Sequence, residues 1–152
     1  MKRLLSRAVA SALVSAASLV ALGLSGTAAY AAGTAYYVDC GATTNGSGTQ
    51  ASPWNSTAAV SSYPFVAGDS VLFRRGRVCN GALTFSRAGT AGNPITIDAY
   101  GSGALPVIDG RDAQAAVQLT NPSNVTVANL EIRNATRWGL LATTTTAATY
   151  SN

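Results

Sequence analysis

Four charged residues occupy two short segments of the chain. Asp109 and Arg111 lie in the first segment, and Glu131 and Arg133 lie at the equivalent places in the second. If the two segments are neighbouring strands, equivalent residues are about 4.8 Å apart and all four side chains share one face. Carboxylates can hold a divalent cation, and a basic group nearby can remove a proton that the cation acidifies. The candidate catalytic residues are therefore Asp109, Glu131, Arg111 and Arg133.

A second interpretation of the same four residues needs no ligand. Like charges on neighbouring strands repel each other, whereas an acid beside a base is neutralised. Acids and bases alternating on an exposed face relieve the repulsion that stacking imposes. The residue types favour this solvent-exposed pattern over a catalytic one.

Histidine is absent from the sequence. Its absence excludes a Ser-His-Asp triad, a histidine-ligated zinc ion and an imidazole base. We predict no metal site and no cofactor in this chain.

The two charged segments belong to a longer repeat, with a period of about 22 residues. Residues 95–97 (ITI) align with 117–119 (VQL), which align with 139–141 (GLL). The same spacing relates Leu105 to Val127, Ile108 to Leu130 and Asp112 to Asn134. Turn-forming residues separate the aligned segments, as expected between short strands.

A unit of this length, with short strands and no helical period, is typical of one coil of a parallel β-helix. Each strand then pairs with its equivalent one coil later and needs no hairpin turn. The residues expected to point inward as aliphatic ladders are Ile95, Ile97, Val117 and Leu119. A β-sandwich is the alternative, but no two-residue Asn-Gly or Asp-Gly loop lies between two matched strands. We predict an all-β parallel solenoid.

Residues 1–31 are expected to be a secretory signal peptide. A basic head precedes a run of small apolar residues, and "AYA" at 29–31 places cleavage between Ala31 and Ala32. A retained membrane anchor is less favoured because the run is rich in Ala and Ser. We therefore expect a secreted, extracellular protein with no membrane contact after cleavage.

Removal of the leader changes the charge balance. Seven arginines then face six acidic residues, so the net charge gives no reason to expect nucleic-acid binding.

Cys40 and Cys79 both lie in the exported part. An oxidising compartment favours one disulfide over two free thiols.

Several motifs occur in an order that is typical of one group of exported proteins. They are "AYYVDC" (35–40), "SPW" (52–54), "FVAGDSVLFRRG" (65–76) and "GTAGNPITIDAYGSGALPVIDG" (89–110). Over about residues 35–140 the chain resembles the N-terminal part of secreted bacterial right-handed parallel β-helix proteins, the pectate-lyase-like superfamily. That superfamily contains lyases, hydrolases, esterases and non-catalytic proteins, so the resemblance implies a fold more strongly than a reaction.

The resemblance implies a cap at the N-terminal end of the solenoid. Residues 35–40 are expected to form a closing strand, and residues 56–65 one short helical turn that Pro64 ends. The resemblance also supports the Cys40–Cys79 pairing, because related exported proteins often carry cysteines at both places.

We expect three parts in the chain. After the leader, residues 32–93 form the cap and a first irregular coil, and residues 94–152 form regular coils. The chain stops partway through a coil, and stacked repeats need about three units and protected ends. We therefore expect the N-terminal piece of a longer β-helix, without its active site.

Two groups of residues are candidates for carbohydrate binding. "FRRGR" (73–77) could attract an anionic polysaccharide, although arginines are also common at exposed strand ends. Aromatic rings can stack on sugars, and the candidates are Tyr36, Tyr37, Trp54 and Trp138. Trp54 is expected to pack in the cap. Trp138, in a turn between coils, is the carbohydrate-binding candidate.

Lyases of the resembled superfamily hold calcium against an acidic sugar with carboxylates, and a basic residue abstracts the C5 proton. None of the four charged residues matches such a catalytic motif residue by residue, so calcium is implied only for a full-length lyase relative. We expect a carbohydrate-active protein of the lyase or glycoside hydrolase type that acts on or binds extracellular polysaccharide. The alternatives are a non-catalytic extracellular carbohydrate-binding or surface module and an inactive fragment.

Overall fold

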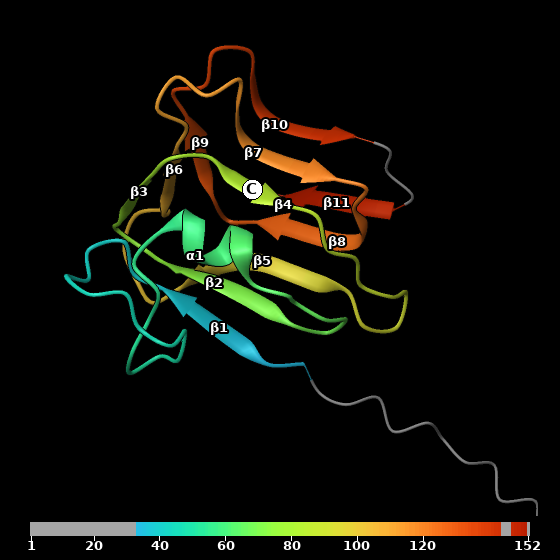
Figure 1. Cartoon of the computed structure of the whole chain (residues 1–152), viewed down its shortest axis with the longest axis horizontal. Coiled ribbons are helices and arrows are strands. Elements are labelled where there is room, and N and C mark those ends of the chain that lie inside the picture. Colours follow the sequence, from blue (N-terminus) through green and yellow to red (C-terminus); the bar gives the residue numbers. More distant parts are fainter. Residues whose placement is uncertain (1–32, 144–146, 152) are drawn as a thin grey trace, which may run out of the picture.

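The computed structural model describes residues 33–143 and 147–151. The expected leader and its cleavage site between Ala31 and Ala32 lie outside these residues. In chain order the elements are β1 (Ala35–Val38), α1 (Thr57–Ser62), β2 (Ser70–Arg74), β3 (Val78–Asn80), β4 (Leu83–Phe85), β5 (Ile95–Tyr100), β6 (Val107–Asp109), β7 (Ala115–Thr120), β8 (Ser123–Ala128), β9 (Glu131–Arg133), β10 (Trp138–Thr143) and β11 (Ala147–Ser151) (Figure 1).

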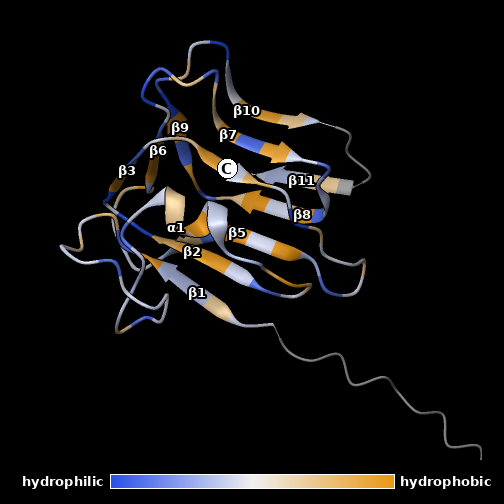
Figure 2. Ribbon diagram, viewed as in Figure 1, coloured by the Kyte–Doolittle hydropathy of each residue, from blue (hydrophilic) through white to orange (hydrophobic). Residues whose placement is uncertain are grey.

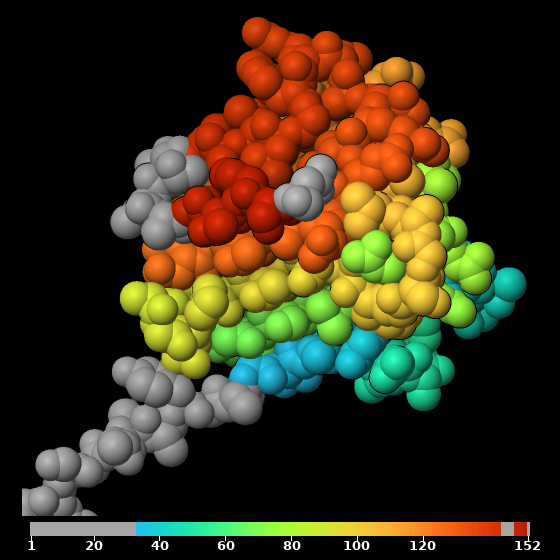
Figure 3. Space-filling view, turned by 180° about the vertical axis from the view of Figure 1, so that it is seen from behind, coloured from blue at the N-terminus to red at the C-terminus, as the bar shows by residue number. Residues whose placement is uncertain are grey.

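The strands wind as successive coils around a common core. Their order is β1-β2-β5-β8-β11 in one sheet, β10-β7-β4 in the second and β3-β6-β9 in the third. Every pair of named strands is parallel. In Figure 3 the five-stranded sheet appears as bands that follow the sequence colours from cyan to red. The structure thus confirms the all-β parallel solenoid and excludes the antiparallel sandwich.

The predicted repeat does not give the spacing between neighbouring coils. Ile97 pairs with Val71 and Val127 in the five-stranded sheet, whereas Leu119 pairs with Phe85 in the β10-β7-β4 sheet. The segments 95–97 and 117–119 therefore lie on different faces of the solenoid, and the predicted period is wrong. Their similarity reflects a shared alternation of inward and outward residues, which any two strands of the coil carry.

The sequence separation between paired residues varies from coil to coil because the turns differ in length. Val71 pairs with Ile97, 26 positions later, and Ile97 pairs with Val127, 30 positions later. Residues 101–106 connect β5 to β6, whereas only residues 129–130 connect β8 to β9. A turn can lengthen without moving the strands beside it. Successive coils can therefore keep the same geometry while they differ in the number of residues.

The pairing of β10 with β7 was predicted with an error of one residue. Leu140, not Gly139, lies beside Val117. A shift of one residue exchanges the two faces of a strand, so Leu140 and Ala142 are the residues that lie beside the inward Val117 and Leu119. Both Leu140 and Ala142 pack against the core.

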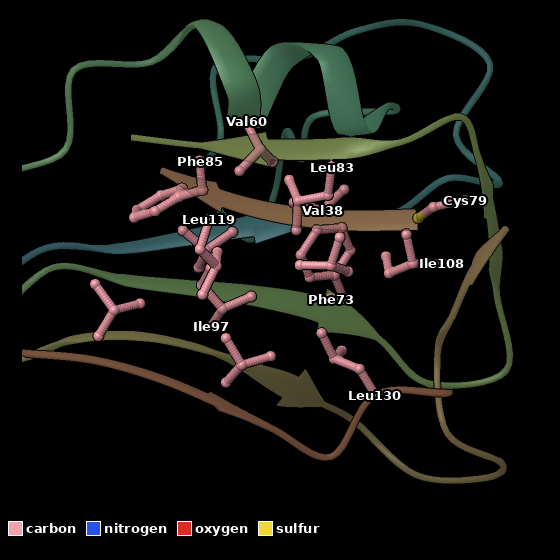
Figure 4. Packing of buried hydrophobic residues seen from close by; sticks show 14 of the residues in the cluster. Val38, Val60, Phe73, Cys79, Leu83, Phe85, Ile97, Ile108, Leu119 and Leu130 are labelled. Carbon is pink, nitrogen blue, oxygen red and sulfur yellow. The ribbon is translucent and has the colours of Figure 1, made fainter. Parts of the chain in front are cut away.

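The core consists of the inward side chains of all three sheets. Ile95, Ile97, Val117 and Leu119 have no exposed surface, which confirms that they point inward. The ladder predicted between 95–97 and 117–119 is wrong, because the two segments belong to different sheets. The alternation that places them inside is visible in Figure 2 as hydrophobic and hydrophilic bands along β5 and β7. Figure 4 shows Phe73, Ile97, Ile108 and Leu119 converging between the sheets.

The helix α1 covers β4, the edge strand of its sheet. Ser61 Oγ accepts a hydrogen bond from Thr84 N (3.1 Å), and Thr57 Oγ1 donates to Gly81 O (3.3 Å). Val60 has no exposed surface and points toward Leu83 and Phe85 (Figure 4). The helix therefore satisfies an open strand edge and closes one end of the core.

The ends of α1 follow the sequence signals. Ser56 is the N-cap, and its Oγ accepts a hydrogen bond from Ala59 N (3.4 Å). Tyr63 leaves the helical conformation directly before Pro64, as predicted. At six residues, α1 is short, and within residues 33–143 and 147–151 no helix combines the length and apolar character needed to cross a bilayer.

The closing strand and the disulfide of the cap are also confirmed. β1 pairs with β2 at the end of the five-stranded sheet. Trp54 is buried and its ring stacks on Tyr36 (centroids 5.2 Å apart), so it packs in the cap as expected. Cys40 and Cys79 form a disulfide with Cα atoms 5.2 Å apart. The bridge fastens the segment after β1 to β3 of the first coil.

Candidate functional site

The predicted charged ladder exists in a different register, on the outer face of the β3-β6-β9 sheet. Asp109 lies beside Asn80 on one side and Arg133 on the other, and Glu131 lies beside Val107. The expected pairing of Asp109 with Glu131 and of Arg111 with Arg133 is therefore wrong. The cause is the longer path from β6 to β9, which brings Arg133 into register with Asp109 and so places a base beside an acid.

Asp109 is buried and hydrogen-bonded by the surrounding turns. Its carboxylate accepts hydrogen bonds from Asn134 Nδ2 (2.8 Å) and Arg111 N (3.1 Å), and Arg133 Nε lies 3.6 Å away. The hydrogen bond from Asn134, followed by that from Arg111 N, lowers the pKa of Asp109 below its ordinary value. An ionised carboxylate of this kind accepts protons poorly and cannot act as a general acid near neutral pH.

The other three charged residues extend the same network. Arg133 Nη1 donates to Glu131 Oε1 (3.4 Å), and Arg111 Nε donates to Asn80 Oδ1 (3.0 Å). Arg111 has left the strand and adopts a φ of 48° in the turn after β6. These contacts fit the expected pattern of compensating charges better than a catalytic arrangement, although Asp109 is buried and not solvent-exposed as expected.

Asparagines at coil corners are the residues whose role the sequence analysis missed. Asn129 and Asn134 have φ values of 52° and 55°, in the left-handed region that Asn tolerates better than most residues. Asn129 Nδ2 donates to Asp98 Oδ1 (2.8 Å), as Asn134 does to Asp109. The available signal was an Asn directly after a short strand, one coil beyond an Asp.

Trp138 is the first residue of β10, directly after the turn where it was expected. It is 36% exposed. The guanidinium of Arg137 lies 4.3 Å from its ring centroid, within the range of a cation–π contact. An exposed aromatic ring at a strand end can stack on a sugar, with Arg137 as a hydrogen-bond donor beside it.

The "FRRGR" segment surrounds one buried carboxylate. Asp39 accepts hydrogen bonds from Arg74 Nη1 (2.6 Å) and Gly41 N (2.9 Å), and it forms an ion pair with Arg77 Nε (2.9 Å). Burial acts to raise the pKa of Asp39, but the Gly41 N–H and the two guanidiniums outweigh burial and lower that pKa. The carboxylate thereby fixes the position of two exposed arginines.

The described part of the chain contains no group of three or more His, Cys, Asp or Glu side chains that could hold a metal ion. Asp109 and Glu131 instead take their partners from arginine and asparagine.

No protein-family model matches this chain, and no curated protein matches it. Two solved structures of the GH136 lacto-N-biosidase from Eubacterium ramulus are similar to it. The native enzyme matches at 30% identity and a TM-score of 0.59, over 68% of this chain and 21% of the enzyme. The selenomethionine derivative matches at 31% identity and a TM-score of 0.57, over 66% and 20%. The chain thus spans about a fifth of the length of a glycoside hydrolase that it resembles in both sequence and fold.

Proposed function

We propose that this chain belongs to an exported, carbohydrate-active β-helix protein of the glycoside hydrolase kind. The observation that carries the proposal is the similarity to the GH136 lacto-N-biosidase at about 30% identity over two thirds of this chain. The disulfide between Cys40 and Cys79 is compatible with an extracellular protein. The described coils serve as the cap and scaffold, and polysaccharide is the partner.

A non-catalytic carbohydrate-binding role is the second candidate. Asp109 favours it, because its lowered pKa is unsuited to the general acid of a glycosidase and its carboxylate is already held by Asn134 and Arg111 N. Trp138 then supplies the stacking surface, and the charged network around Asp109 has a structural role.

The two candidates are separated by assays on the full chain. Binding is measured by affinity electrophoresis in gels that contain neutral or acidic polysaccharides. Turnover is measured as new reducing ends for hydrolysis, and as ultraviolet absorbance of unsaturated products, with and without calcium, for a lyase of the pectate-lyase-like kind. Retention without either product supports the binding role. If the chain shows no retention and no turnover with any polysaccharide, both candidates are contradicted.

Two variants refine this result. Trp138→Ala is expected to weaken binding, and Asp109→Asn is expected to leave any turnover in place while lowering the melting temperature. Loss of turnover in a folded Asp109→Asn protein would restore Asp109 as a catalytic residue.

The export proposal has its own measurement: mass spectrometry of the protein recovered from culture medium is expected to find Ala32 at the N-terminus.

A further inference from the structure

A basic cleft lies on the outer face of the solenoid near its N-terminal end. It has a volume of about 710 Å³ and is formed by β1, β2, the end of β5 and the turns that follow β2 and β5. The side chains that matter in its wall are Tyr37, Leu72, Arg74, Arg75, Arg77 and Tyr100. This cleft is distinct from the charged network around Asp109, which lies on the β3-β6-β9 sheet.

The charge of the cleft is positive. Arg74, Arg75 and Arg77 contribute three positive charges, and Asp39 compensates one of them. Asp98, the neighbour of Leu72 on β5, also lies close to the cleft. Its carboxylate accepts hydrogen bonds from Asn129 Nδ2 (2.8 Å) and Ala99 N (2.6 Å). Three guanidiniums against two carboxylates leave a net positive surface.

The arginines keep free donors. A guanidinium carries five N–H groups, and Asp39 accepts one hydrogen bond or ion-pair contact from each of two arginines. The side chains of Arg74 and Arg77 remain 50% and 43% exposed while Asp39 holds them. Arg75 is placed by a hydrogen bond from its Nη1 to Gly103 O (3.4 Å). Preorganised guanidiniums of this kind match the paired oxygens of a carboxylate or a sulfate.

Two aromatic rings complete the cleft. Tyr37 and Tyr100 meet edge to face, with centroids 5.1 Å apart and planes at 85°. A pyranose ring presents an apolar C–H face and a polar rim, which suits an amphipathic tyrosine beside hydrogen-bond donors. Tyrosines that can contact a sugar ring, next to arginines that can bind its acid group, suit a charged sugar better than a small inorganic anion.

We propose that this cleft binds an anionic polysaccharide, whose carboxylate or sulfate groups contact Arg75, Arg74 and Arg77 and whose sugar rings contact Tyr37 and Tyr100. The inference rests on the proposed carbohydrate-active function and specifies the class of ligand. Asp39 acts as a positioning residue, because it orients the arginines and does not itself face the anion.

The test is calorimetric titration of the full chain with three probes: an oligogalacturonate, a heparin-derived oligosaccharide and a neutral galacto-oligosaccharide. The expected result is binding of one or both acidic probes, weakened by added salt, and little binding of the neutral one. Comparison of the carboxylated probe with the sulfated probe identifies the acid group. Equal binding of all three probes overturns this inference but leaves the carbohydrate-binding function in place. Failure of every probe overturns this inference alone, because the proposed function is decided separately by the retention and turnover assays on polysaccharides.

Variants locate the site. Arg75→Gln and Tyr100→Ala are each expected to weaken binding of the acidic probe about tenfold, because each removes a direct contact. Arg87→Gln is the matched control, since it removes the same charge from an arginine that contacts Tyr63 O beside α1. Circular dichroism melting shows that each variant is folded. Undiminished binding in both folded cleft variants, or an equal loss in Arg87→Gln, places the ligand elsewhere.

Discussion

Buried carboxylates tie together segments of this chain that are distant in sequence. Asp69 Oδ1 accepts a hydrogen bond from Thr34 N (2.9 Å), and its Oδ2 accepts one from Val66 N (2.9 Å). Asp39 and Asp109 have the same role at two other corners, each with a backbone N–H and a side chain from another element. Corners of this kind let the backbone turn without leaving buried polar groups unpaired.

The stability that Asp39 provides is expected to depend on pH. The pKa of Asp39 is lowered in the folded protein, so its contribution is complete above the ordinary value of 3.8 and is lost as the pH falls through the lowered value. Asp39→Asn is expected to reduce the free energy of unfolding by about 2 kcal/mol at neutral pH. The difference from the unaltered protein should shrink in acid, as measured by urea unfolding at a series of pH values.

Asp112→Asn is the control for this prediction, because Asp112 is an exposed carboxylate in a turn. Its effect on the free energy of unfolding should be small at every pH. A pH-independent loss in Asp39→Asn would show that packing, and not the charge of Asp39, is responsible.

A pair of tyrosines in the cap is expected to make the stability of the fold depend on pH in the alkaline range as well. The hydrogen bond between Tyr36 OH and Tyr63 OH (2.7 Å), together with burial, raises the pKa of Tyr36 to about 12. This raised pKa stabilises the fold below the ordinary value of 10.0, and the contribution is lost as the pH rises from 10.0 to about 12. In Tyr63→Phe the pKa of Tyr36 should move down toward 10.0, which the ultraviolet absorbance of tyrosinate measures. An unchanged titration would contradict the assigned cause.

At the scale of elements, the turns determine which strands become neighbours. Thr96 lies beside Thr126, 30 positions later, and both point outward. In the repeat predicted from the sequence, Thr96 would instead lie beside Gln118. The two registers make different predictions for chemical cross-linking.

The pair Thr96→Cys and Thr126→Cys should form a disulfide under mild oxidation, because adjacent strands hold such Cα atoms about 4.8 Å apart, within the range that a disulfide spans. The pair Thr96→Cys and Gln118→Cys should remain reduced as an intramolecular pair. Mass spectrometry of peptides from the oxidised proteins distinguishes them. A cross-link in the second pair and not in the first would restore the period predicted from the sequence.

At the scale of the whole molecule, the two ends of the solenoid differ. At the N-terminal end, β1, α1 and an aromatic cluster around Trp54 cover the core. At the other end, a cavity of about 710 Å³ is lined mainly by apolar side chains of β8, β9, β10, β11 and the turn between β8 and β9, among them Leu130, Ile132 and Leu140. Apolar surface of this kind is costly to leave in water.

The apolar end should bind a hydrophobic dye such as anilinonaphthalene sulfonate. Leu140→Glu is expected to lower the dye fluorescence severalfold, because it places in the apolar lining a negative charge that repels the sulfonate of the dye. Val66→Glu is the matched control, since Val66 is 63% exposed and lies near the capped end. Equal fluorescence in the two variants would mean that the dye binds elsewhere.

The sequence alone determined the fold class, the cap and the disulfide. Alternation of apolar and polar residues in strands such as 95–97 and 117–119 set which side chains point inward, and this pattern depends only on the two-residue period of a strand. Pro64 set the C-terminal end of α1 for an equally local reason. Cys40 and Cys79 were the only two cysteines, so one bridge had one possible pairing.

Only the tertiary structure decided which residues meet across coils. The register depends on turn lengths and on left-handed residues such as Asn129 and Asn134, whose effect on the path of the chain is not encoded in any hydrophobic period. For this reason the sequence pattern paired Asp109 with Glu131, whereas Asp109 lies beside Arg133 in the structure. The same physical reason left Tyr37 and the "FRRGR" arginines as separate candidates and left out Tyr100, because only the winding of the coils brings these three segments together.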